Sequence, residues 1–134
     1  MFGSHTIVFR DAGFRPAFPD YMAQDGTDEN LKRDRSLVCR TCSHSITRME
    51  EGIAMNGKQI HALFNPAGIL FEVGCFAAAP GCSFEGMFIH EFSWFAGYAW
   101  RYAFCRQCGT HLGWEYRGEV GGFVGLIMSE LREG

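Results

Sequence analysis

The chain has little proline, no long apolar segment and no cluster of basic residues. Four of its 134 residues are proline, and glycine or proline interrupts its apolar stretches well before the roughly 18 residues that a membrane span needs. Twelve basic residues face 15 acidic ones, which gives a formal net charge of −3. We therefore expect neither a nucleic-acid nor a membrane partner. The N-terminus carries Arg10, Asp11 and Arg15 and no apolar signal-peptide core, so we expect a cytoplasmic protein.

The sequence changes in character near residue 36. Residues 1–35 are polar and irregular, and we interpret them as an N-terminal arm. Residues 36–134 consist of short apolar or alternating runs separated by glycine, which is typical of β strands. None of these runs keeps a helical apolar stripe for three turns, so the predicted fold class is all-β. The expected strands cover residues 60–65, 69–76, 84–94, 98–105, 111–117 and 122–131.

Two Cys-x-x-Cys pairs stand far apart in the chain, Cys39 with Cys42 and Cys105 with Cys108. Two residues between cysteines allow one tight turn to present both thiolates to a single Zn²⁺ at about 2.3 Å, and two such turns complete a tetrahedral site. Four thiolates leave no position for water, so this zinc is expected to be structural. Two disulfides or a redox motif are the alternatives, but a redox pair normally opens a helix and no helical pattern follows either pair.

The other candidate residues near the cysteines have simpler interpretations. Cys75 and Cys82 are interpreted as core or turn residues, since free cysteine is commonly buried, and a disulfide between them is left open. His111 follows Cys108 by three residues, and we interpret it as a structural histidine, although it could also order the zinc loop.

All three tryptophans lie around the second cysteine pair: Trp94, Trp100 and Trp114. Two aromatic rows flank that pair, and in a hairpin both would lie on one face and pair across the strands. The rows are Trp100, Tyr102 and Phe104, then Leu112, Trp114 and Tyr116. A loop containing Gly97 would carry Trp94 over the same face. The tryptophans either fill the core or line a pocket, and a pocket is favoured because the indole N–H needs a partner and tryptophan is seldom buried whole.

These motifs resemble the CULT domain, the thalidomide-binding domain of the cereblon family. The resemblance covers residues 37–131. It is carried by Phe-Ser-Trp-Phe-Ala-Gly-Tyr-Ala-Trp at 92–100, Cys-Arg-Gln-Cys at 105–108, His-Leu-Gly-Trp-Glu-Tyr at 111–116 and Asn-Pro-Ala-Gly at 65–68, with the first cysteine pair and the run Phe-Val-Gly-Leu at 123–126.

The resemblance implies a β-tent, in which two roughly orthogonal antiparallel sheets are pinned by one zinc. It further implies a binding domain without enzymatic activity that takes glutarimide, thalidomide-type compounds, uracil-like rings or cyclised protein C-termini. The implied cage walls are Trp94, Trp100 and Trp114, with Tyr116 as the fourth aromatic. Backbone groups of Phe92 and Trp94 are implied to hold the imide, with Asn65 at the rim.

The sequence departs from the family pattern at three positions. Ala96 replaces a proline, which is expected to loosen the loop; Phe92 replaces a histidine; and Tyr116 replaces a phenylalanine, which adds a hydroxyl. We see no adaptor-binding region in this chain, so ubiquitin-ligase recruitment is not expected. The chain resembles single-domain bacterial members of the family in size.

Two alternative functions compete with imide binding. Three tryptophans would also suit a quaternary ammonium or methyl-lysine, with Glu91 or Glu115 supplying charge. The β-tent also resembles methionine sulfoxide reductase B, whose nucleophilic cysteine lies downstream of the second pair. No cysteine follows Cys108 here, so an enzyme is not expected.

Overall fold

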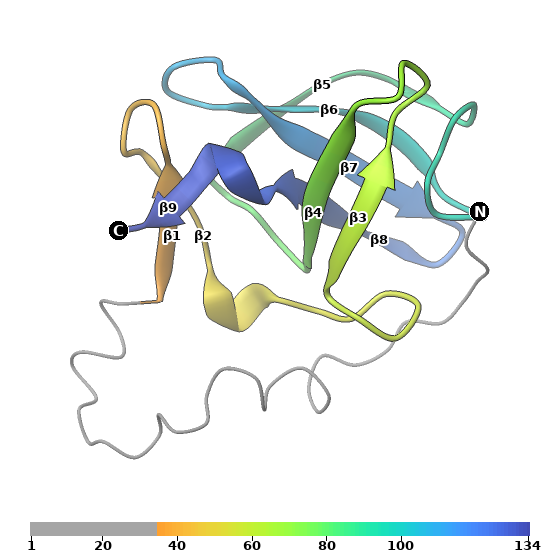
Figure 1. Cartoon of the computed structure of the whole chain (residues 1–134), viewed down its shortest axis with the longest axis horizontal. Helices are drawn as coiled ribbons and strands as arrows, with labels where there is room; N and C mark the ends of the chain where they lie inside the picture. The colour runs from red at the N-terminus through yellow and green to blue at the C-terminus, as the bar shows by residue number, and fades with distance from the viewer. Residues whose placement is uncertain (1–34) are drawn as a thin grey trace.

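The computed structural model describes residues 35–134, and these form two antiparallel sheets (Figure 1). A three-stranded sheet has the order β2-β1-β9, and a six-stranded sheet has the order β3-β4-β8-β7-β6-β5. The predicted all-β class is confirmed. The strands are β1 (Ser36–Cys39), β2 (Ser45–Arg48), β3 (Ile60–Phe64), β4 (Leu70–Phe76), β5 (Cys82–Ile89), β6 (Ala99–Cys105), β7 (His111–Gly118), β8 (Gly121–Ile127) and β9 (Leu131–Glu133).

The predicted N-terminal arm lies outside the described residues except for Arg35, and its separation from the rest of the chain stays a prediction. The first strand begins at Ser36. None of the segments within residues 35–134 forms a helix with the length and apolar character of a membrane span.

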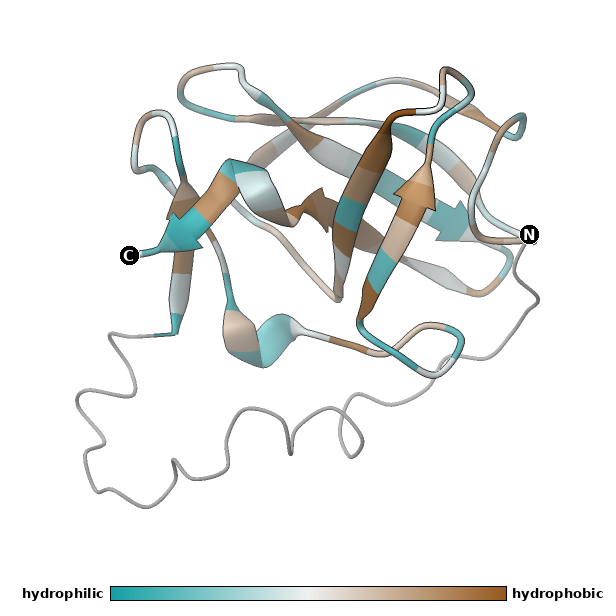
Figure 2. Cartoon of the chain, viewed as in Figure 1, coloured by the Kyte–Doolittle hydropathy of each residue, from teal (hydrophilic) through white to brown (hydrophobic). Residues whose placement is uncertain are grey.

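Two clusters of buried hydrophobic residues form the core. The first joins both sheets and includes Leu37, Ile46, Phe76, Leu112, Leu126 and Leu131. The second lies under the large sheet and includes Val73, Phe95, Trp114, Tyr116, Phe123 and Ile127. Strands β4 and β8 contribute to both clusters, and Figure 2 shows β4 as mostly hydrophobic. Burial on both faces explains why these strands read as apolar runs rather than as a clean alternation.

Two predicted strands have different bounds from those expected. The strand predicted over 84–94 ends at Ile89, after a break in the β5–β6 register between Glu85 and Ile89, so residues 90–98 form a loop. The strand predicted over 122–131 is split by a single 3₁₀ turn, Met128–Glu130. The turn is needed because β9 leaves the large sheet and pairs with β1. Strands β1 and β2 have four residues each, too few for a readable alternation.

Candidate functional site

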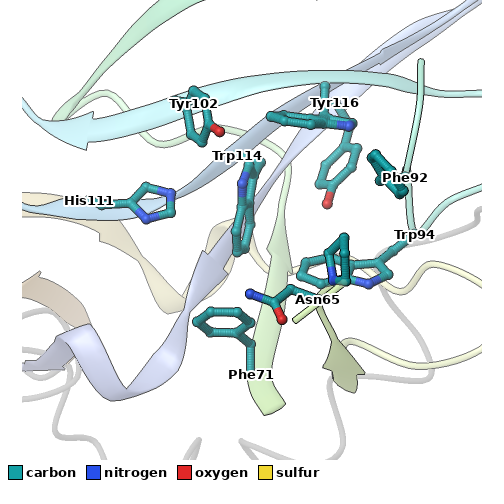
Figure 3. Close-up of a pocket in the computed structure, with 10 residues that line it drawn as sticks. Asn65, Phe71, Phe92, Trp94, Tyr102, His111, Trp114 and Tyr116 are labelled. Carbon is teal, nitrogen blue, oxygen red and sulfur yellow. The ribbon is translucent and has the colours of Figure 1, made fainter. Parts of the chain in front are cut away.

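An aromatic pocket of about 430 Å³ opens on one face of the large sheet (Figure 3). We call it the aromatic pocket and define it by the ten residues that line it: Asn65, Pro66, Phe71, Phe92, Trp94, Trp100, Tyr102, His111, Trp114 and Tyr116. All six residues predicted from sequence as ligand-binding are among them. They come from the β3–β4 turn, the 90–98 loop, β6 and β7, so four separate segments meet at one cavity.

The indole walls are held in place by backbone carbonyls and by each other. Trp94 Nε1 donates a hydrogen bond to the Phe64 carbonyl oxygen at 2.7 Å, and Trp100 Nε1 donates to that of Glu91 at 2.8 Å. The ring of Trp94 meets that of Trp114 edge-on, with centroids 5.0 Å apart. Since two indole N–H groups already have partners, these rings offer a ligand their faces rather than their donors.

The hairpin of β6 and β7 brings the two aromatic rows together as expected, with one correction. Trp100 pairs with Tyr116 and Tyr102 with Trp114, but Phe104 pairs with His111 rather than with Leu112. A bulge between Ala103 and Phe104 causes the shift. It turns the Leu112 side chain into the first core cluster and leaves the His111 position on the pocket face.

The bulge depends on a close backbone approach at Gly113. A Cβ at this position would lie 2.0 Å from the carbonyl oxygen of Gly125 on β8, which no side chain can tolerate. His111, interpreted from sequence as a structural histidine, therefore lines the aromatic pocket, edge-on to Trp114 at 5.1 Å. Its Nε2 lies 3.0 Å from the Gly113 carbonyl oxygen, and burial lowers the pKa of its ring, so the ring is neutral at pH 7.

The four cysteines of the two Cys-x-x-Cys pairs form one cluster, with all four sulfur atoms within 4.8 Å of one another. The Cys39 and Cys108 sulfurs are 3.7 Å apart, and those of Cys42 and Cys105 are 3.6 Å apart. A tetrahedral zinc at 2.3 Å from each sulfur requires separations of about 3.8 Å. The thiols therefore fit a structural Cys₄ zinc site, as predicted, and all four are free of disulfides.

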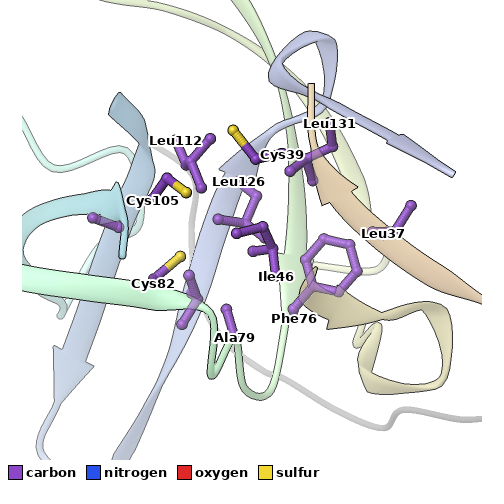
Figure 4. Close-up of a cluster of buried hydrophobic side chains, with 12 residues drawn as sticks. Leu37, Cys39, Ile46, Phe76, Ala79, Cys82, Cys105, Leu112, Leu126 and Leu131 are labelled. Carbon is purple, nitrogen blue, oxygen red and sulfur yellow. The ribbon is translucent and has the colours of Figure 1, made fainter. Parts of the chain in front are cut away.

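Both halves of the zinc site are built by the same turn. In each half the first cysteine accepts a bond from the backbone N–H four residues later and donates to the carbonyl five residues later. The residue after each pair, Ser43 or Gly109, has a positive φ of 69° or 82°. Figure 4 shows Cys39 and Cys105 among the side chains of the first core cluster, so the zinc site is continuous with the core that joins the two sheets.

Thiols inside and outside the zinc site differ in their exposure. Hydrogen bonds from Thr110 lower the pKa of the exposed Cys108 thiol to about 6, which favours the thiolate form that zinc binds. Cys75 and Cys82 lie outside the zinc site and are both free and buried, so the open question of a disulfide between them is answered against it.

No family model matches the chain, but several relatives do. The chain is 30% identical to protein cereblon of Drosophila virilis over 115 residues, which cover 80% of this chain and 18% of that protein. It is 30% identical to protein cereblon of Drosophila mojavensis over 112 residues, which cover 78% of this chain and 17% of that protein. The chain carries a cereblon-like (CULT) domain. It spans less than one fifth of the length of these relatives.

In the cereblon-like domain, the 90–98 loop is anchored by one buried aromatic side chain. Phe95 is 1% exposed and meets the rings of Tyr116 and Phe123 edge-on, each at 5.0 Å. The Ser93 hydroxyl bonds to the Phe95 backbone, and the Tyr98 N–H donates to the Phe95 carbonyl oxygen at 3.0 Å. These contacts hold the loop although Ala96 replaces the expected proline.

The same loop leaves two backbone groups available at the pocket. Among residues 35–134, neither the carbonyl oxygen of Phe92 nor the N–H of Trp94 has a hydrogen-bond partner. Phe92 has a φ of 61°, a strained conformation for a non-glycine residue. An acceptor on Phe92 and a donor on Trp94 therefore lie two residues apart in a loop whose residues line the aromatic pocket.

Asn65 and the β3–β4 turn form part of the rim of the pocket. The side-chain oxygen of Asn65 accepts hydrogen bonds from the N–H groups of Ala67 and Ile69, both at 2.9 Å, so Asn65 fixes the β3–β4 turn. Phe71 on β4 also lines the pocket, and sequence reasoning missed it. The centroid of its ring lies 5.7 Å from that of Trp114. Phe71 carried no local signal, because its position in an apolar run fits a core residue equally well.

Proposed function

We propose that the aromatic pocket of this cereblon-like domain binds a neutral cyclic imide and does no chemistry on it. The observation that carries the proposal is the combination of indole walls with the unpaired carbonyl of Phe92 and N–H of Trp94. An imide presents an N–H between two carbonyls, so the Phe92 carbonyl accepts from the imide N–H while the Trp94 N–H donates to a flanking carbonyl. The flat ring then packs against the faces of Trp94, Trp100 and Trp114.

The charge around the pocket favours a neutral ligand over a cation. None of the ten lining residues is acidic. Glu115, the candidate partner of a cation, lies on the opposite face of β7 and pairs with Arg101 at 2.7 Å. Glu91 contributes its backbone carbonyl to Trp100, and its side chain does not line the pocket. A quaternary ammonium or methyl-lysine would therefore interact only with the indole faces and would find no carboxylate in the pocket lining.

The size of the ligand sets the expected affinity. Glutarimide has about eight non-hydrogen atoms, and at roughly −0.7 kcal/mol per atom its dissociation constant is in the tens of micromolar. The ligand class includes glutarimide, thalidomide-type compounds, uracil-like rings and the cyclic imides that form at protein C-termini by cyclisation of asparagine or glutamine. All share the imide edge that the loop would bind.

Titration of the zinc-loaded protein with glutarimide and N-methylglutarimide, followed by tryptophan fluorescence, tests the proposal. Glutarimide should bind, and its N-methyl derivative should bind at least tenfold more weakly because the carbonyl of Phe92 is left without a donor. Trp100→Ala should weaken glutarimide binding by at least tenfold, since it removes one wall.

Phe88→Ala is the matched control, because Phe88 packs against Arg101 and Arg117 and does not line the pocket. Its glutarimide affinity should equal that of the wild type. Failure of both imides to bind would overturn the proposal. In that case a trimethylammonium ligand should be titrated, and its binding would identify the pocket as a cation cage.

A further inference from the structure

The hydroxyl group of Tyr116 is a buried polar group that the proposed imide contacts do not use. Tyr116 is 2% exposed and lines the aromatic pocket. Within residues 35–134 its hydroxyl oxygen, Oη, has no hydrogen-bond partner. Figure 3 shows this hydroxyl directed into the space between Trp114 and Trp94. Buried hydroxyls almost always have a partner, so a bare one at a cavity indicates a partner that enters the cavity.

The ring of Tyr116 cannot turn to bring its hydroxyl into bulk solvent. It is stacked on Phe123 with centroids 4.8 Å apart and an interplanar angle of 16°, and Phe95 meets it edge-on at 5.0 Å. On the neighbouring strand, Trp100 is its cross-strand partner. The direction of the hydroxyl is therefore fixed by the packing of the second core cluster.

The fixed hydroxyl of Tyr116 affects how tightly a ligand binds in the cavity. Without a ligand, water that enters the pocket can bond to Oη. A ligand that displaces this water either supplies a hydrogen-bonding atom at the same place or leaves the hydroxyl bare, and the second case weakens binding. The ring that binds best therefore has a polar atom facing β7, in addition to the imide edge that faces the 90–98 loop.

We infer that Tyr116 is a specificity-determining residue that selects cyclic ureides, in which a second ring N–H is bonded to one of the imide carbonyls, over imides whose other ring atoms are all carbon, such as glutarimide. The inference rests on the proposed function, since it takes the imide edge to be held by Phe92 and Trp94. The ring N–H donates to Oη. Burial raises the pKa of Tyr116 well above its usual range, so the hydroxyl stays protonated and neutral and accepts through its lone pairs.

Dihydrouracil and glutarimide form a matched pair for the test, because they differ by one ring N–H in place of a CH₂ group. Both are titrated into wild-type protein and into Tyr116→Phe, which keeps the ring and removes only the hydroxyl. The ratio of the dihydrouracil affinity to the glutarimide affinity should fall roughly five- to tenfold in the variant. Glutarimide should bind the variant more tightly than the wild type, because Tyr116→Phe removes the hydroxyl that glutarimide leaves without a partner.

The outcomes separate the inference from the function on which it rests. If both rings bind the wild type and the affinity ratio is the same in Tyr116→Phe, the inference is wrong and imide binding stands. If neither ring binds the wild type, both fail. Zinc content and thermal unfolding show whether the variant is folded. N1-methyldihydrouracil, which lacks the second N–H, should respond to the substitution no more than glutarimide does, and a larger response would contradict the role of that N–H.

Discussion

Replacement of Cys39 by serine should leave the domain without a cooperative native state at room temperature. Structural Cys₄ zinc contributes an apparent free energy on the order of 10 kcal/mol or more. The whole free energy of unfolding of a domain is typically about 5–15 kcal/mol. Cys39 is fully buried, so a weaker hydroxyl ligand at this position also leaves an unsatisfied polar group in the core.

The position of the zinc site explains why its loss should affect more than a local turn. It ties the β1–β2 turn to the β6–β7 turn, and two of its cysteines, Cys39 and Cys105, belong to the core cluster that joins the two sheets. The small sheet contains only strands of three or four residues. Such a sheet does not hold together alone, so without zinc β1, β2 and β9 should detach from the large sheet.

Circular dichroism melting and zinc content measure the effect, with chelation of the wild-type protein as an independent route to the same state. Cys75→Ala is the matched control, because Cys75 is equally buried but lies outside the zinc site. The control should keep one zinc per chain and lose only about 1–2 kcal/mol of stability. If Cys39→Ser unfolds with the same midpoint as the wild type, zinc does not hold this fold.

Sequence reasoning reached the parts of this structure that depend on residues close in the chain. The zinc site follows from two-residue spacings within each cysteine pair, and the pairing of Trp100 with Tyr116 follows from alternation on either side of the second pair. Such patterns can be interpreted from sequence alone, because a tight turn and a pleated strand fix the directions of their side chains without contacts from the rest of the fold.

The parts that sequence reasoning missed depend on contacts between distant segments. The bulge that brings His111 to the pocket requires the backbone of β8 to lie against Gly113. The break after Ile127 reflects the crossing of β9 to the other sheet, which nothing within residues 122–131 reveals. The third case, Phe71, reaches the pocket only because β4 and β7 flank β8 in the large sheet.

The two phenylalanines of the 90–98 loop should respond very differently to truncation. Phe95→Ala should lower the free energy of unfolding by about 3–5 kcal/mol, because Phe95 is 1% exposed and the cavity left against Tyr116 and Phe123 cannot close. Phe92→Ala should change it by at most about 0.5 kcal/mol, because the Phe92 side chain is 72% exposed. Urea unfolding of both variants measures the difference.

Binding measurements on the same pair connect the anchor of the loop to the pocket. If the loop binds the imide through backbone groups, Phe92→Ala should keep the glutarimide affinity within about threefold, since its carbonyl oxygen is still present. Phe95→Ala should weaken binding at least tenfold even under conditions where the variant is folded. Without its anchor, the loop must be ordered when the ligand binds, and that ordering opposes binding. Equal affinities for the two variants would mean that Phe95 stabilises the fold without positioning the loop.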